Sequence, residues 1–421
     1  MHKSFIPVSS DSHFPIQNLP FGVFKHINTK GKAHIGVAIG EFILDLTYLA
    51  EKNFFSVIIS DKEVFKCGNL NKFMSLNKDI RKNFREKLKV LLDENNPVIR
   101  DDKELREKCL YLQKDCEMVM PVKIGDYTDF YSSREHATNV GIMFRGKENA
   151  LMPNWLHLPV GYHGRASSVI ISGTKIIRPQ GQTKADSEEN PKFGESKLLD
   201  FELEMGYFIS NGNKLGHPIK ADNALENVFG LTIVNDWSAR DIQKWEYQPL
   251  GPFLAKNFAT TISPWIVTLD ALEPFKKDNV DQSPEPLPYL KPQNNFTYDI
   301  ILEVYLKTKN SETPFLICKS NFKYLYWSIQ QQVAHHTITG CNLQTGDLLA
   351  SGTISGAEPD SFGSMLELTW RGEKPIKLPN GEERKFIQDG DSVIMTAYCQ
   401  GDGYRVGFGT SEGEILPSIK D

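Results

Sequence analysis

The hydrophobic period of this chain changes twice along its length, and this change constrains the fold more than any other feature. Within residues 22–46, short apolar runs are separated by the turn-forming residues 28–32, a pattern typical of a small antiparallel meander or an SH3-like barrel. Within residues 71–118 the apolar side chains recur at helical spacing instead. They form two runs: Ile80, Phe84, Leu88 and Leu91, and then Leu105, Cys109, Leu112 and Cys116. We therefore expect two amphipathic helices, separated near Pro97, that pack on the first strands.

After Pro121 the pattern turns to short strands separated by glycines and polar turns. One convincing helix is predicted from Tyr324 to His335, and the proline-rich residues 281–292 favour an extended loop. Strands are predicted at Val169–Ile171, Leu199–Ile209, Val228–Val234, Trp265–Leu269, Ile300–Leu306, Asp347–Ala350, Met365–Trp370 and Ser392–Tyr398. The sequence thus predicts a mainly β protein with helices, of the α+β class. A small N-terminal domain of residues 1–118 precedes a large domain of residues 119–421.

Composition and charge exclude several classes of function. With 40% hydrophobic and 24% charged residues among 421, the composition is that of an ordinary globular protein. The formal net charge of −5 leaves no basic footprint for nucleic acid and no polybasic surface for anionic lipid. No apolar run approaches the ~20 residues needed to span a bilayer, and the first residues lack an apolar core of signal-peptide length. The six cysteines form no C-x-x-C pair, so we expect reduced thiols and a cytoplasmic protein.

Residues 199–208 carry the most informative acidic pattern. Side chains alternate across a strand, so Glu202 and Glu204 are predicted to share one face. Two carboxylates placed in this way lie about 7 Å apart. On a buried strand they repel each other unless a cation or a proton intervenes. The pattern alone fits equally the polar, solvent-facing side of an edge strand.

A second polar cluster, in residues 234–247, follows an apolar strand. A helix that begins near its first acid would place four polar side chains on one face, namely Asp236, Arg240, Gln243 and Tyr247. An acid, a guanidinium, an amide and a phenol at the end of a strand can bind a metal ion together with a carboxylate or carbonyl oxygen. A solvated helix face with an aspartate N-cap is the alternative interpretation.

A third cluster lies in residues 125–136, where Asp129 is a candidate hard ligand and His136 a candidate general base. A lone histidine is more often a structural residue. Together the three clusters offer carboxylate oxygens but no paired His or Cys, which suits Ca2+ or Mg2+ rather than zinc or copper. The sequence has no EF-hand loop, H-E-x-x-H or Walker A motif. The segments GTSEG at residues 409–413 and SGTISG at residues 351–356 are not interpreted as nucleophile elbows of the G-x-S-x-G type, which disfavours a serine hydrolase.

Long segments of the chain resemble the fumarylacetoacetate hydrolase family, nearly from end to end. Among them are LLDFELEM at residues 198–205 and NDWSARDIQ at residues 235–243. The other matching segments are residues 18–24, 126–134, 136–141, 158–168, 249–254, 349–356 and 398–404. The resemblance implies an SH3-like N-terminal domain, a C-terminal mixed β-sandwich roll and a homodimer.

The resemblance also implies a metal site for Ca2+ or Mg2+. Carried over residue by residue, its ligands would be Asp129, Glu202, Glu204 and Asp236. A second position of the Mg2+ type would use Asp236, Lys256 and Thr260. The lysine cannot be an ordinary ligand while it is protonated.

The same resemblance assigns roles to the residues around that site. His136 would be the general base, oriented by Glu367. Negative charge on oxygen would be stabilised by Arg240, Gln243 and Lys256, and the substrate contacts would be Tyr131, Arg145, Gln243, Tyr247 and Thr353. Neither list follows from spacing or periodicity.

The activity implied by the resemblance is hydrolysis of the carbon–carbon bond of a 1,3-diketo acid. The substrate would be 4-fumarylacetoacetate, split into fumarate and acetoacetate in the last step of tyrosine and phenylalanine catabolism. Expected partners are this small molecule and a second copy of the chain, without nucleic acid or membrane. Two alternatives stay open: an acylpyruvate hydrolase or isomerase of the same superfamily, and a non-catalytic binding protein stabilised by its metal.

Overall fold

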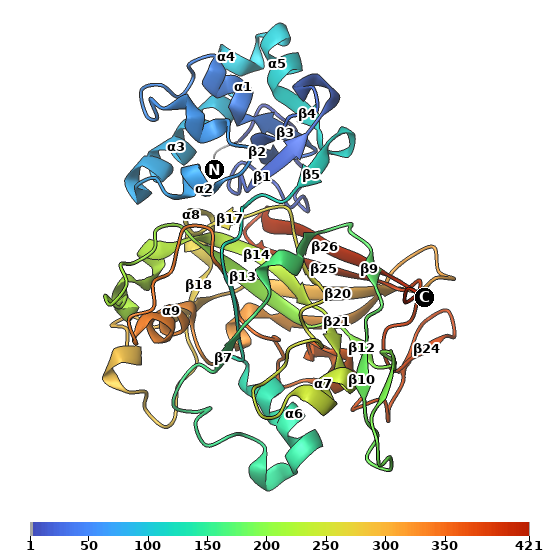
Figure 1. Ribbon diagram of the computed structural model, residues 1–421. Helices are drawn as coiled ribbons and strands as arrows, with labels where there is room; N and C mark the ends of the chain where they lie inside the picture. The colour runs from blue at the N-terminus through green and yellow to red at the C-terminus, as the bar shows by residue number, and fades with distance from the viewer. Residues whose placement is uncertain (1–2, 421) are drawn as a thin grey trace.

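The computed structural model describes residues 3–420 and has two parts of unequal size (Figure 1). The smaller part, blue in Figure 1, is built from the N-terminal residues and lies against one side of the larger part. This arrangement confirms the predicted α+β class, with a distinct small N-terminal module before a large, mainly β domain. Among the described residues, no helix has both the length and the apolar character needed to cross a membrane.

The N-terminal module is an antiparallel sheet covered by short helices. Its strands are β1 Phe21–Lys25, β2 His34–Ile39, β3 Phe42–Asp45, β4 Leu110–Leu112 and β5 Glu117–Val119. They lie in the order β4–β3–β2–β1–β5. The helices are α1 Leu46–Glu51, α2 Asn71–Met74, α3 Lys78–Leu92, α4 Pro97–Arg100 and α5 Lys103–Cys109. The first predicted helical stripe lies on α3, whose Phe84, Leu88 and Leu91 are buried in the core of the module.

The large domain contains two main sheets. The first consists of β6 Tyr127–Phe130, β7 Gly161–His163, β8 Val169–Ile171, β13 Leu203–Ile209, β14 Val228–Asp236, β16 Thr260–Ile262, β17 Val267–Thr268 and β22 Leu348–Ala350. Its order is β7–β6–β22–β13–β14–β16–β8, with β17 paired to β14. The second consists of β9 Ile176–Ile177, β20 Ile301–Lys307, β21 Phe315–Asn321, β25 Ser392–Gln400 and β26 Arg405–Leu416, in the order β21–β20–β25–β26–β9. Each sheet is mixed, because it contains parallel as well as antiparallel pairs.

Smaller elements surround these sheets. Four two-stranded ribbons pair β10 Gln180–Thr183 with β11 Lys192–Glu195, β12 Leu199–Asp200 with β15 Ser238–Ala239, β18 Lys276–Asp278 with β19 Phe296–Tyr298, and β23 Ile376–Lys377 with β24 Glu383–Arg384. The helices of the domain are α6 Arg134–Arg145, α7 Arg240–Glu246, α8 Leu269–Leu272, α9 Ile329–Thr337 and α10 Met365–Leu368.

Apolar packing joins all these layers. The inner faces of the two main sheets share one core, in which Leu231 and Ile233 of β14 lie with Val393 and Met395 of β25, as a β-sandwich requires. A second core spans the junction between the module and the domain, and it includes residues of β1, α3, β14 and β22. The backbone amide of Phe21 also donates to the carbonyl of Ile266 at 2.9 Å. The N-terminal module is therefore packed on the large domain rather than tethered to it.

Three predicted elements differ from the observed ones. The second helical run was expected to reach Cys116, but α5 ends at Cys109 and the chain enters β4, which pairs with β3. The strand predicted from Met365 is the short helix α10, whose N-cap, Ser364, accepts a hydrogen bond from the amide of Glu367. Asp236 does not begin a helix; it is the last residue of β14. In the first and third cases, pairing with another strand outweighs the local period. In the second case the N-cap directly before the helix does so.

Two further elements have boundaries that differ from the predicted ones. The strand predicted over Leu199–Ile209 is broken into β12 and β13, and the break falls at Phe201 and Glu202. The predicted helix from Tyr324 begins only at Ile329, because Ser328 forms a capping box with Gln331.

Candidate metal centre and adjoining cavity

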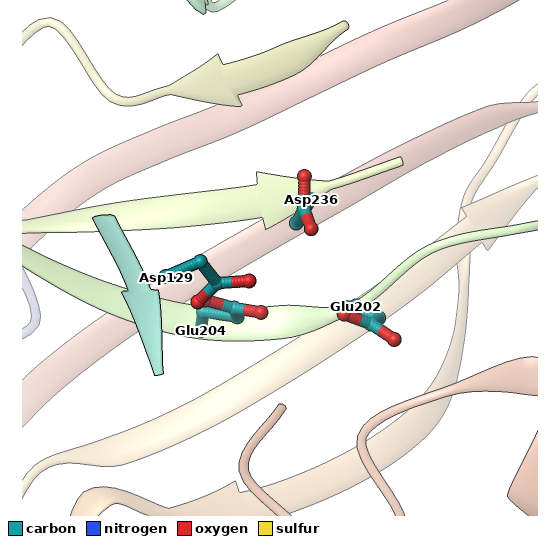
Figure 2. A group of neighbouring side chains, drawn as sticks. All are labelled: Asp129, Glu202, Glu204 and Asp236. Carbon is teal, nitrogen blue, oxygen red and sulfur yellow. The ribbon is translucent and has the colours of Figure 1, made fainter. Parts of the chain in front are cut away.

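Four carboxylates from separate positions in the sequence meet in the interior of the large domain (Figure 2). Asp129 lies on β6, Glu204 on β13 and Asp236 at the end of β14, while Glu202 lies in the break before β13. Each offers one oxygen, and these four oxygens all lie within 4.8 Å of one another. All four residues are buried, so the solvent-facing alternative for the acidic strand is wrong.

Strand pairing explains why these acids converge. β22 pairs in parallel with β6 and antiparallel with β13, and β13 pairs with β14. Alternation on the chain then points Glu202 and Glu204 to the same side. Just beyond β22, the amide of Gly352 donates to Asp129 Oδ1 at 3.2 Å and to Glu204 Oε2 at 3.1 Å. One backbone amide thus holds two acids that are 75 residues apart in the chain.

The electrostatics of Asp129 and Glu204 fit a site for a divalent cation. Burial and the neighbouring acids raise the pKa of both carboxyl groups well above their usual range. Glu204 Oε1 is buried and has no hydrogen-bond partner among the described residues, although such atoms are nearly always paired. A hard cation ligated by these oxygens would relieve both the repulsion and the missing contact. The residues present therefore fit a hard divalent cation, with Glu202, Glu204, Asp129 and Asp236 as the candidate ligands.

Fixed positive charges lie on one side of the acidic group. Lys256 Nζ donates to Glu202 Oε2 at 2.5 Å and to Asp236 Oδ2 at 2.6 Å, and Arg240 Nη1 lies 2.7 Å from Glu202 Oε1. Burial would raise the pKa of Glu202, but Lys256 and Arg240 outweigh it and hold that pKa well below its usual range. Asp236 also accepts from Thr260 Oγ1 at 3.0 Å, yet burial leaves its pKa raised.

A histidine–carboxylate pair lies beside the acidic group. His136 Nδ1 is 2.6 Å from Glu367 Oε2, and both side chains are buried. Glu367 also accepts hydrogen bonds from Asn139 Nδ2, Ser355 Oγ and Ser364 Oγ. Although burial would raise the pKa of Glu367, the imidazole and these donors keep it below its usual value. With Nδ1 donating to an ionised carboxylate, the lone pair of the ring is on Nε2.

The buried acid Asp200 links Arg240 to this pair. Its Oδ2 accepts from Arg240 Nε at 2.8 Å and from the amide of Leu366 at 3.0 Å, and its Oδ1 accepts from the amide of Met365 at 2.7 Å. The first turn of α10, which carries Glu367, is therefore fixed to the same carboxylate as the guanidinium. Sequence reasoning missed this residue, although Asp200 lies in the same acidic segment as Glu202 and Glu204.

A cavity of about 500 Å3 opens onto the acidic group and the histidine. Of the residues assigned by the resemblance, those that line it are Asp129, Tyr131, His136, Arg145, Glu202, Arg240, Gln243, Tyr247, Lys256 and Thr353. Glu204, Asp236, Thr260 and Glu367 lie behind this wall. All the residues that the resemblance assigns therefore either line this cavity or lie directly behind its wall.

Several lining groups have free hydrogen-bonding capacity. Arg240 Nη2 and Thr353 Oγ1 are buried without a partner among the described residues. Arg240 Nη1 also donates to Gln243 Oε1 at 3.1 Å, and the ring of Tyr131 stands edge-on to His136. Arg145, in contrast, already donates to the carbonyls of Asn149 and Ala150. The unpaired donors on the wall suit an oxygen-rich ligand.

Tyr162 is another residue that sequence reasoning missed. Its hydroxyl donates to Asp236 Oδ2 at 3.1 Å, and its side chain lines the cavity. The residue lies on β7 inside the matching segment 158–168, but no spacing rule connects that edge strand to β14.

Comparison with known proteins places this geometry in context. The profile described as Fumarylacetoacetase N-terminal matches residues 17–121, and the one described as Fumarylacetoacetate (FAA) hydrolase C-terminal matches residues 126–415. The chain is 58% identical to the fumarylacetoacetase of Homo sapiens and 57% identical to that of Bos taurus, in both cases over 99% of each protein. A solved fumarylacetoacetate hydrolase from psychrophilic Exiguobacterium antarcticum has a TM-score of 0.50 at 17% identity, covering 95% of this chain and 99% of that chain. This last likeness concerns the fold alone.

Proposed function

Because this chain belongs to the fumarylacetoacetate hydrolase family, we propose that it hydrolyses the carbon–carbon bond of 4-fumarylacetoacetate. The products are fumarate and acetoacetate, in the step that ends tyrosine and phenylalanine catabolism. The observation that carries the proposal is the shared cavity, whose wall contains both the acidic group and the histidine of the His136–Glu367 pair. A non-catalytic binding protein has no need of an oriented imidazole beside its metal ligands.

A cation would be held by Asp129, Glu202, Glu204 and Asp236, and it would supply Lewis-acid stabilisation for negative charge on a diketo oxygen. We propose Ca2+ or Mg2+, because all four ligands are carboxylates. A second position at Asp236, Lys256 and Thr260 stays a prediction. It would require Lys256 to lose its proton, while the neighbouring carboxylates raise the pKa of that ammonium despite its burial.

His136 acts as the general base in this proposal. Its Nε2 takes a proton from water, and the resulting hydroxide adds to the carbonyl carbon next to the bond that breaks. Glu367 holds the ring in the required tautomer and stabilises the imidazolium. When the carbon–carbon bond breaks, the departing carbon takes a proton, so that one water molecule is divided between the two acids.

Arg240, Gln243 and Lys256 stabilise negative charge on the oxygen of the attacked carbonyl. Preorganised donors of this kind contribute about 3–4 kcal/mol each in other hydrolases. Tyr131, Arg145, Tyr247 and Thr353 contact the carboxylate ends of the substrate. The free Nη2 of Arg240 and the free hydroxyl of Thr353 support these assignments.

Three broader assignments are also predictions. We propose a homodimer, by analogy with the family, and a cytoplasmic location, from the reduced thiols expected of the sequence. We also propose a domain boundary between residues 118 and 119.

The decisive experiment follows the ultraviolet absorbance of the diketo chromophore. We expect purified protein to remove the absorbance of 4-fumarylacetoacetate when Mg2+ or Ca2+ is present, and to release fumarate and acetoacetate in equal amounts. Acylpyruvates, offered in parallel, should be poor substrates. If acylpyruvates are cleaved and fumarylacetoacetate is not, the acylpyruvate hydrolase alternative is correct. If neither is cleaved but the cation raises the Tm, the chain is a metal-stabilised binding protein.

A further inference from the structure

Two buried arginines on α3 lack an acidic partner. Arg81 and Arg85 are 9% and 3% exposed. Arg85 Nη2 donates to the carbonyls of Gln17 and Asn18, but its Nε and Nη1 have no hydrogen-bond partner among residues 3–420. Arg81 Nη1 donates to the carbonyl of Met74, and its guanidinium lies 5.7 Å from the centre of the Phe229 ring. Within the same residues, no carboxylate oxygen lies within 4.0 Å of either guanidinium.

Both arginines line a small cavity at the junction of the N-terminal module and the large domain. The cavity has a volume of about 30 Å3, and its other walls come from β1, α2, β14, β17 and α8 together with Leu225. Thr268, on β17, also lines it, and its buried hydroxyl has no hydrogen-bond partner in the part of the chain that the structure describes. Three hydrogen-bond donors with no acceptor therefore belong to residues around one void, and they come from both sides of the junction.

The nearby acids do not neutralise this site. Asp270 lines the cavity but is exposed, and its charge reaches the two arginines only from beyond ion-pair distance. Glu226 is paired with Lys78 at 2.7 Å. Burial lowers the pKa of both arginines, yet a guanidinium does not lose its proton in a protein. A buried cation without a counter-ion is strongly unfavourable, so the missing charge must come from outside the chain.

We propose that this cavity binds one small inorganic monoanion of the size of chloride. The ion accepts hydrogen bonds from Arg85 Nε and Nη1 and from the hydroxyl of Thr268, while Arg81 adds positive charge. A volume of about 30 Å3 holds only one or two water-sized particles, which excludes phosphate and organic carboxylates. The anion links α3 to β17 and so fastens the N-terminal module to the large domain. This site shares no residue with the cavity beside His136.

Thermal unfolding of the full-length protein tests the proposal. The Tm is measured with saturating Mg2+ in sodium gluconate, which is then replaced stepwise by sodium chloride at constant ionic strength. We expect a saturable rise of roughly 2 °C or more, as for any ligand that binds only the folded state. Bromide should act in the same way and should give an anomalous diffraction peak between Arg85 and Thr268. A Tm that does not respond to chloride, or a bromide peak elsewhere only, overturns the proposal.

Single variants test whether Arg85 and Thr268 form the chloride site. Arg85→Met should abolish the chloride-dependent rise, whereas Arg100→Met, which removes a partly exposed arginine of the same module, should retain it. If Arg85→Met does not fold, Thr268→Val provides the test, because it removes only the hydroxyl and should raise the half-saturating chloride concentration. Asp270→Asn should lower that concentration by removing a repulsive charge. If chloride stabilises Asp270→Asn but not the parent protein, Asp270 is itself the counter-ion and the proposal is wrong.

Discussion

Glu202, in the break before β13, and Glu204, on β13, are two residues apart and both buried, but their surroundings give them opposite properties. Glu202 contacts Lys256 and Arg240, which hold its pKa below the usual range. Glu204 faces Asp129 and the other acids, has an unpaired oxygen, and has a raised pKa. The site therefore has two halves. One half already contains its positive charges, and the other needs a cation from solution.

This comparison indicates which task each half performs. The half around Glu202 adjoins Arg240, His136 and the cavity, where charge develops during the proposed reaction. In the half around Glu204 and Asp129, the carboxylates repel one another unless a cation binds. The following variants and treatments separate the two halves, beginning with the largest expected effect.

Removal of the cation acts on the half that lacks positive charge. We expect an excess of chelator to lower turnover of fumarylacetoacetate by about 1,000-fold or more, since Lewis-acid stabilisation is worth several kcal/mol. The absorbance assay measures this loss, and added Mg2+ or Ca2+ should reverse it. Undiminished activity after exhaustive chelation would contradict the proposed reaction.

Replacement of His136 acts on the other half. His136→Ala should lower kcat by about 100- to 10,000-fold, the range typical of a lost general base. The Tm rise caused by Mg2+ or Ca2+ should remain, because the four ligands are intact. The control is His335→Ala, which removes a histidine that contacts Tyr289 and should leave kcat unchanged. Near-native turnover in His136→Ala would exclude the base assignment.

Asp200→Asn tests the support shared by Arg240 and α10. We expect a stability loss of about 2–4 kcal/mol, because a buried arginine loses one of its two charged partners, and a kcat roughly tenfold lower. Asp391→Asn is the matched control, since Asp391 is equally buried and pairs with Arg384 at 2.8 Å. That variant should lose comparable stability in denaturant without a change in kcat. Equal kcat values in the two variants would show that Asp200 stabilises the fold but does not contribute to catalysis.

The two halves also predict how pH affects the metal-free protein. Burial and like charges raise the folded-state pKa values of Asp129 and Glu204, so folding takes up protons at these groups above about pH 4. Their contribution to stability is full below that pH and is lost as the pH rises through the raised values. We expect the metal-free Tm to fall from pH 5 to pH 8 and the Tm rise caused by the cation to grow over the same range. Glu204→Gln should weaken both trends. If the dependence of the Tm on pH is the same in this variant as in the parent protein, Asp129 and Glu204 are not the source of the uncompensated charge.

The smallest expected effect concerns Tyr162. Tyr162→Phe removes one hydrogen bond to Asp236, a loss of about 0.5–1.5 kcal/mol. Cation affinity, measured by titration of the Tm, should therefore fall by roughly two- to tenfold. Tyr305→Phe, which removes a hydroxyl that donates to Glu303 on the second sheet, should leave cation affinity as it is.

The sequence was a good guide where a local pattern decides the structure. The stripe on α3 and the alternation at Glu202 and Glu204 predicted a buried helix face and a pair of acids on one side. Asp236 shows the limit, because an apolar strand followed by polar residues fits both a helix start and a strand end. In the structure, the pairing of β14 with β16 makes Asp236 the last residue of a strand. The prediction of a strand at Met365–Trp370 was wrong for a different reason. The side chain of Ser364 accepts a hydrogen bond from the amide of Glu367 and so begins the helix α10.

Parts of the site could be predicted only through the family resemblance. Nothing in the local sequence connects His136 to Glu367, which lies 231 positions later. Asp200 and Tyr162 were missed altogether, because their contacts reach across the fold to α10 and β14. Spacing rules describe one helix or one strand, whereas these contacts depend on sheet order.

The parallel pairing of β6 with β22 has a consequence for the order in which this protein is made. Asp129 is near the start of the large domain, whereas Gly352, which holds it next to Glu204, is translated more than 200 residues later. Contacts so distant in sequence form late, since the loop between them must close first. A nascent chain that ends before β22 therefore lacks the strand that brings Asp129 next to Glu204. Because β22 must be synthesised before the cation site is complete, we expect truncated translation products that lack β22 to bind no cation.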